Sequence, residues 1–84
     1  MSDRHAGFLT VALVKAGHVD QWATIRPDGK RVVVELRYDR RRDTFRVIET
    51  LSHANGSPFT ERETEHTYLS EAHDAFTTLT LKHR

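Results

Sequence analysis

The sequence predicts an α+β fold: an antiparallel β-meander of four to five strands followed by one C-terminal helix packed on one face. Two observations carry this prediction. A β-branched, apolar run at 31–38 follows a Pro-Asp-Gly turn at 27–29, which is the arrangement of a hairpin leading into a central strand. Apolar residues then repeat at helical spacing over 72–79. With 84 residues, the chain is expected to form a single small globular domain over 1–84.

Residues 8–15 form an apolar run that is too short for its periodicity to separate a helix from a strand. As a helix, the run would end at Gly17, a typical residue just beyond a helix C-terminus. As a strand, it would pair with residues 18–25 and give the meander its fifth strand. We favour the strand because the run contains three β-branched residues, Thr10, Val11 and Val14.

Residues 19–25 and 31–38 are expected to form a hairpin around the Pro-Asp-Gly turn. The proline presets φ at the first corner, the aspartate side chain bonds its own backbone, and the glycine supplies a positive φ. A three-residue loop of this kind pairs Trp22 with Val34 across the two strands.

A second hairpin is expected to join the central strand to a strand at 43–51 through a four-residue loop at 39–42. A register shifted by one residue would place Leu36 opposite an arginine, so we predict the register that keeps apolar residues together. The expected cross-strand pairs are Leu36–Phe45, Val34–Val47 and Glu35–Arg46. One face of the sheet is then the core, made of Trp22, Val32, Val34, Leu36, Tyr38, Phe45 and Val47.

Residues 60–69 alternate in the manner of a further strand, with Glu61, Glu63 and Glu65 on one side. If this strand pairs antiparallel with 43–51, the glutamates lie on the face that carries the arginines. Cross-strand charge pairs would follow from that arrangement.

The C-terminal segment is expected to be a helix that Ser70 caps, with Glu71 and Asp74 in its first turn, where carboxylates interact favourably with the helix dipole. Its apolar stripe should cover the core face of the sheet and consists of Ala72, Ala75, Phe76 and Leu79. Cations at 82–84 suit the C-terminal end of a helix.

Charge is nearly balanced over the chain but unevenly placed. The net charge is +1, with ten basic and seven acidic residues in 1–50 and three and five in 51–84. This disfavours an acidic mimic of nucleic acid and is compatible with a nucleic-acid partner. No apolar stretch is long enough to span a membrane, the apolar run near the start lacks a signal-type cleavage site, and cysteine is absent. We therefore expect a cytoplasmic protein without disulfides or thiolate metal sites.

Residue types typical of metal binding and catalysis are present without the patterns that such sites need. The six histidines show no His-x-x-x-His spacing, and zinc requires three or four converging ligands, so neither a metal nor another cofactor is expected. Ser70, His73 and Asp74 are close in sequence, but no nucleophile elbow, oxyanion loop or glycine-rich phosphate loop accompanies them. We therefore expect that the protein is not an enzyme.

The densest positive patch is the hairpin tip at 40–42, and a basic tip of this kind can bind phosphate oxygens bidentately. The plainer alternative is a solvated turn that keeps the sheet soluble, because acidic residues flank the run and nearby glutamates can neutralise it. We assign partner binding to the arginines of the tip and of the adjoining strands, Arg37, Arg40, Arg41, Arg42 and Arg46.

These observations favour a small, non-enzymatic binding protein that docks on a larger macromolecule as an inhibitor, adaptor or regulator, of the type found in phages and mobile elements. Its partner would be a protein or a nucleoprotein complex. The alternative is a nucleic-acid-binding protein that uses the same arginines. A homodimer through an open edge of the sheet is a further hypothesis, because unpaired strand edges are templates for pairing.

Overall fold

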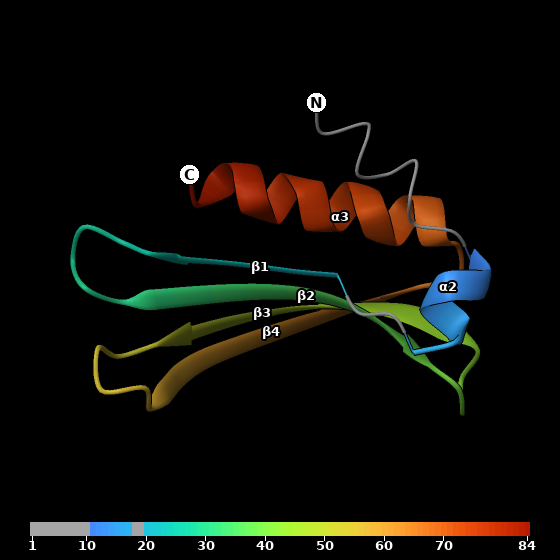
Figure 1. Cartoon of the computed structure of the whole chain (residues 1–84), viewed down its shortest axis with the longest axis horizontal. Coiled ribbons are helices and arrows are strands. Elements are labelled where there is room, and N and C mark those ends of the chain that lie inside the picture. Colours follow the sequence, from blue (N-terminus) through green and yellow to red (C-terminus); the bar gives the residue numbers. More distant parts are fainter. Residues whose placement is uncertain (1–10, 18–19) are drawn as a thin grey trace.

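The computed structural model describes residues 11–17 and 20–84. In chain order, the described residues form α2 (Val11–Lys15), β1 (Asp20–Ile25), β2 (Arg31–Asp39), β3 (Thr44–Ser52), β4 (Pro58–His66) and α3 (Leu69–Lys82). Figure 1 shows the strands as one twisted sheet, with α3 lying across one face and α2 near one end. The predicted α+β fold, an antiparallel meander with a C-terminal helix packed on one face, is confirmed with four strands.

The strands follow one another across the sheet in the order β1-β2-β3-β4, each antiparallel to its neighbour. The β1–β2 hairpin has the predicted register, with Trp22 opposite Val34. In its turn, the Asp28 carboxylate accepts a hydrogen bond of 3.0 Å from the Lys30 amide. Gly29 has a φ of +86°. Asp28 and Gly29 therefore take the roles that their chemistry predicts.

The β2–β3 hairpin differs from the prediction by two residues. Leu36 lies opposite Val47, and Tyr38 lies opposite Phe45. The Asp39 carboxylate accepts hydrogen bonds of 2.9 and 3.3 Å from two backbone amides of the loop, so the turn begins one residue later than predicted. The rings of Tyr38 and Phe45 pack together at 5.4 Å between centroids. This aromatic pair and the aspartate turn select the observed register.

The shift also overturns the predicted pairs Val34–Val47 and Glu35–Arg46, since Glu49 lies opposite Val34 and Ile48 lies opposite Glu35. A shift of two residues nevertheless leaves every side chain on its predicted face, because side chains alternate along a strand with a period of two. The predicted core face is confirmed. Its buried apolar residues, together with those that α2 and α3 contribute, are Val14, Val32, Val34, Leu36, Phe45, Val47, Leu69, Ala72 and Phe76.

The strand that we favoured at 8–15 is wrong in its described part. Residues 11–15 form the helix α2, while residues 8–10 lie outside the described residues. Gly17 follows the helix with a φ of +107°, as the helical alternative requires. The β-branched composition does not decide the outcome because Val14, 1% exposed, is buried in the core from the helix. The described residues accordingly contain no fifth strand.

Helix α3 begins earlier than predicted. Its N-cap is Tyr68, in an extended conformation and without a side-chain capping bond, rather than Ser70. The buried Leu69 at the start of the helix accounts for this, since burial of a leucine outweighs a capping hydrogen bond at the surface. Glu71 lies in the first turn as predicted, whereas Asp74 lies beyond it. The predicted apolar stripe packs on the sheet and comprises Ala72, Ala75, Phe76 and Leu79.

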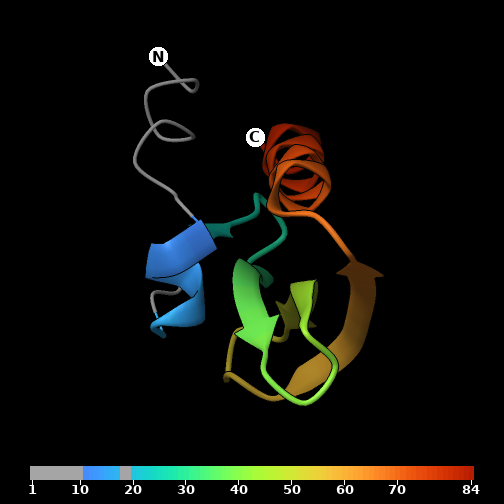
Figure 2. The same cartoon turned by 90° about the vertical axis from the view of Figure 1, so that its right-hand side faces the viewer.

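The two faces of the sheet are therefore distinct, and the view in Figure 2 shows α3 on one side only. We call the face beneath α3 the covered face. The other, which no described helix lies across, is the open face. It carries Ile25, Arg31, Val33, Glu35, Arg37, Arg46, Ile48, Glu61, Glu63 and Glu65. None of the helices described is both long and apolar enough to cross a membrane.

Candidate functional site

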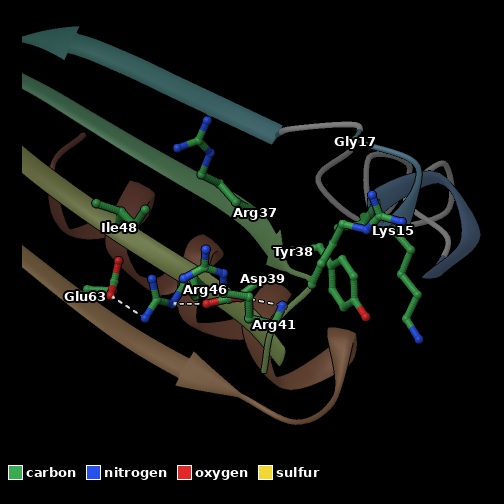
Figure 3. A pocket seen from close by; sticks show the side chains of 11 residues that line it. Lys15, Gly17, Arg37, Tyr38, Asp39, Arg41, Arg46, Ile48 and Glu63 are labelled. Atoms are coloured by element: carbon green, nitrogen blue, oxygen red, sulfur yellow. Dashed lines mark hydrogen bonds and ion pairs between the residues drawn. The ribbon is translucent and has the colours of Figure 1, made fainter. Parts of the chain in front are cut away.

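An open hollow of about 520 Å³ lies where the open face meets α2 and the β2–β3 hairpin (Figure 3). Five of its eleven lining residues are basic and two are acidic, so the lining has a net charge of +3. The whole chain has a net charge of only +1, so positive charge is concentrated in the hollow relative to the chain as a whole. The lining residues are Val14, Lys15, Gly17, Arg37, Tyr38, Asp39, Arg40, Arg41, Arg46, Ile48 and Glu63.

The hollow contains four of the five arginines that the sequence singled out. Strand β2 contributes Arg37, the loop of the hairpin contributes Arg40 and Arg41, and β3 contributes Arg46. The observed register places Arg37 directly opposite Arg46 across the two strands. The fifth, Arg42, is not part of the lining. Figure 3 shows Arg37, Arg41 and Arg46 around the hollow, with Lys15 on its far side.

Arg46 is held by carboxylates on both sides of its strand. Its Nε lies 3.4 Å from Asp39 and 3.9 Å from Glu65, and its Nη2 lies 3.3 Å from Glu63. Figure 3 shows the first and last of these residues, Asp39 and Glu63, joined to Arg46 by dashed lines. The predicted cross-strand charge pairs between the arginine face and the β4 glutamates are thus confirmed. Because these carboxylates offset its charge, Arg46 stabilises the floor of the hollow and attracts an acidic partner only weakly.

Arg42 is similarly engaged, outside the hollow. Its Nη1 donates to both carboxylate oxygens of Glu65, at 3.2 and 3.3 Å. The Thr44 hydroxyl donates to the same carboxylate at 2.8 Å. That hydrogen bond, followed by the contribution of Arg42, lowers the pKa of Glu65 below its ordinary value. Arg42 therefore ties the loop to β4, which leaves it less suited to partner binding than the sequence suggested.

The remaining three arginines of the predicted set are Arg37, Arg40 and Arg41. All three are exposed, and none of them forms an ion pair with any described residue. Arg37 also faces a second arginine across the strands, an arrangement that is unfavourable unless a counter-charge is supplied. Guanidinium groups present five donors in a planar fork that suits carboxylate and phosphate oxygens. An anionic group entering the hollow would find all three forks available.

The far side of the hollow is built from α2 and the end of β2. Lys15 Nζ lies 3.3 Å from Asp43 and 5.3 Å from the centre of the Tyr38 ring. The Tyr38 hydroxyl donates to the Asp43 carboxylate. This hydrogen bond raises the pKa of Tyr38 and, together with Lys15, lowers the pKa of Asp43. These contacts link α2 to the end of the β2–β3 hairpin at this side of the hollow.

Sequence reasoning found the arginines but not the hollow. The lining also includes Lys15, Tyr38 and Ile48, and the hollow depends on α2 and on the observed hairpin register, whereas we favoured a strand at 8–15 and a different register. The run of arginines at the hairpin tip was the only signal available.

The described residues contain no group of three or more histidine, aspartate, glutamate or cysteine side chains that could hold a metal ion. Comparison with protein-family models, with curated proteins and with solved structures finds no match. The geometry of the hollow is therefore the basis on which function is assigned.

Proposed function

We propose that the protein is a non-enzymatic binding protein that docks through the hollow on an acidic surface of a larger macromolecule, either a protein or a nucleoprotein complex. In this role it acts as an inhibitor, adaptor or regulator of its partner, of the type found in phages and mobile elements. The observation that carries the proposal is the gathering of three exposed guanidinium groups, without ion pairs among the described residues, at one hollow.

The energetics of the arginines support this role. Arg37 lies opposite Arg46, and like charges in directly opposed positions destabilise a sheet. The carboxylates around Arg46 offset part of this repulsion, and an acidic partner would offset more of it. Surface charge of one sign also steers a partner of the opposite sign and raises the rate of association.

The test is capture of a partner with two charge-reversed baits. In the first, Arg37, Arg40 and Arg41 are all changed to glutamate. In the second, Arg31→Glu alters an exposed arginine on the same face and strand but at the other end of β2. We expect the wild type and the Arg31 variant to retain one stoichiometric partner, identified by mass spectrometry, and the triple variant to lose it. Retention of that partner by a folded triple variant would contradict the proposal.

The second candidate is direct binding of nucleic acid, because guanidinium forks fit phosphate oxygens as well as carboxylates. Titration of labelled duplex and single-stranded oligonucleotides at low and moderate salt separates the two functions. Binding that weakens steeply with salt would support the nucleic-acid function. Absence of binding at low salt would exclude it and leave the docking function.

The proposal includes a cytoplasmic location, in keeping with a chain that has no cysteine. It also includes a homodimer formed through an outer strand of the sheet, β1 or β4. Light scattering at high protein concentration tests the dimer, and a monomeric mass would remove it without affecting the docking function.

A further inference from the structure

The three arginines that form no ion pair with any described residue all line one hollow. Arg37 comes from β2, and Arg40 and Arg41 come from the loop that follows it, yet all three line the same space of about 520 Å³. That volume lies within the range of pockets that enclose a small ligand or a side chain. The site can therefore admit a charged side chain of a partner and bring it within reach of the three arginines.

A phosphate monoester matches this charge and donor supply better than a carboxylate does. One guanidinium fork satisfies the two oxygens of a carboxylate. A phosphate monoester carries a charge of about −1.5 to −2 at neutral pH and has three strong acceptor oxygens, so it can engage several forks together. Three guanidinium groups that no described carboxylate engages, in a lining with a net charge of +3, suit the doubly charged group.

The surroundings of the hollow argue against a nucleic-acid chain as the source of the phosphate. A chain of phosphate diesters that crossed the open face would meet Glu35, Glu61, Glu63 and Glu65, which share that face with the arginines. The Tyr38 ring packs on Phe45 and beneath Lys15, so it does not offer a free surface for base stacking. The glutamates of the open face thus border the positively charged hollow, an arrangement that suits a single phosphate better than an extended chain of phosphates.

We propose that the hollow binds a phosphorylated side chain of the protein partner. The three terminal oxygens of the phosphate accept hydrogen bonds from Arg37, Arg40 and Arg41. Arg46 keeps its ion pairs with Asp39 and Glu63 and so stabilises the floor of the hollow. This inference rests on the proposed docking function and adds to it the chemical group that is recognised. Phosphorylation of the partner would then switch docking on.

The experiment uses the full chain and short synthetic peptides that differ in one residue. The probes carry a phosphoserine or a phosphotyrosine, and the matched peptides carry glutamate or the unmodified residue at that position. A single-stranded oligonucleotide with at least the same net charge is the remaining probe. Nuclear magnetic resonance follows the arginine Nε–H and backbone signals. We expect saturable binding of a phosphopeptide, at least about tenfold tighter than that of the glutamate peptide.

Variants locate the binding. Because the side chains of Arg37, Arg40 and Arg41 form no ion pair with described residues, their change to glutamine should leave the fold intact. We expect each change to weaken phosphopeptide binding by about tenfold, the loss of one charge-assisted hydrogen bond. Arg31→Gln, the matched change at the far end of β2, should weaken it less than about twofold, since screened surface charges that far apart interact weakly.

The outcomes separate this inference from the docking function. Equal affinity for phosphopeptide, glutamate peptide and oligonucleotide, or signals that shift as much at Arg31 as at the hollow, would overturn the phosphate assignment. If arginine-dependent partner capture survives treatment of the lysate with phosphatase, docking stands and the phosphate assignment fails. If capture does not depend on the three arginines, both fail.

Discussion

The two faces of the sheet carry charged residues in different environments. On the covered face, Glu49 of β3 is 3% exposed and accepts a hydrogen bond from His83, with Lys82 Nζ 4.0 Å away. On the open face, the guanidinium of Arg46 lies among three carboxylates, but its side chain remains about one-third exposed. Glu49 is thus enclosed with its partners from the fold, whereas the positive charge that exceeds the carboxylates on the open side is gathered in the lining of the hollow.

This difference separates charges that serve the fold from charges available to a partner. A buried charge costs several kcal/mol of desolvation, so its partner must be supplied by the fold itself, here by the end of α3. An exposed charge costs little, so the fold can leave Arg37, Arg40 and Arg41 without ion pairs among the described residues. Substitutions on the covered face should therefore change stability, and those at the hollow should change binding.

The largest effect on stability is expected from Phe76→Ala, which removes the aromatic side chain, 6% exposed, that α3 buries on the covered face. Loss of a buried phenylalanine costs about 3–5 kcal/mol of unfolding free energy. Urea unfolding followed by the fluorescence of Trp22, the single tryptophan, measures it. Leu81→Ala on the same helix, where Leu81 is 61% exposed, is the control and should cost less than about 0.5 kcal/mol.

In a chain this small, Phe76→Ala could unfold the protein entirely. Phe76→Leu gives a graded change that keeps the fold populated, with an expected loss of about 1 kcal/mol. Similar losses for Phe76→Leu and Leu81→Ala would show that α3 is not packed as described.

The next effect in size is expected from His83→Ala, which leaves the Glu49 carboxylate buried without its hydrogen-bond donor. Leaving a buried carboxylate without its partner typically costs about 3 kcal/mol. The double variant Glu49→Leu with His83→Leu removes both members and should be nearly as stable as the wild type, because the desolvation cost disappears as well. Urea midpoints measure both. A double variant less stable than His83→Ala would contradict this account.

The parts of the fold that depend on neighbouring residues were predicted from the sequence, and those that depend on packing between distant segments were not. The β1–β2 turn was predicted in detail because Pro27, Asp28 and Gly29 each act within the turn itself. The β2–β3 register depends on the Asp39 side chain in the loop together with the packing of Tyr38 on Phe45 of the next strand. No residue type within the loop reports that packing, so the register was missed by two residues.

Helix α2, the start of helix α3 and the hollow were not predicted, because each depends on contacts between segments that are distant in sequence. Val14 and Leu69 are buried by elements distant in sequence, and their burial outweighs the β-branched composition of one segment and the capping preference of Ser70 in the other. The arginines of the site were visible as a run, but the hollow required the observed register and α2. What is local to the chain was predictable, and what depends on tertiary packing was not.

A smaller effect is expected at the floor of the hollow. Arg46→Ala leaves Asp39, Glu63 and Glu65 facing one another and should cost about 1 kcal/mol of unfolding free energy at low salt. The loss should shrink in 1 M NaCl, where charges are screened beyond about 3 Å. Arg37→Gln is the matched change on the opposing strand and should be neutral or slightly stabilising, since it removes the repulsion with Arg46. Equal losses of unfolding free energy for Arg46→Ala and Arg37→Gln would show that the three carboxylates do not stabilise Arg46 in particular.

The smallest effect concerns the exposed hydrogen bond between Tyr38 and Asp43 at the edge of the hollow. The folded state lowers the pKa of Asp43 through the Tyr38 hydroxyl and Lys15, so its stabilising contribution is present above the unfolded pKa, about 3.9, and is lost as the pH falls through the lower folded value. Carboxyl titration by nuclear magnetic resonance should show the pKa of Asp43 rising toward its ordinary value in Tyr38→Phe. In the reciprocal variant, Asp43→Asn, the raised pKa of Tyr38 should fall toward about 10, as measured by ultraviolet absorbance. Unchanged values in both variants would mean that the two groups do not interact in solution, and the hollow would then lose the contact that fixes this edge.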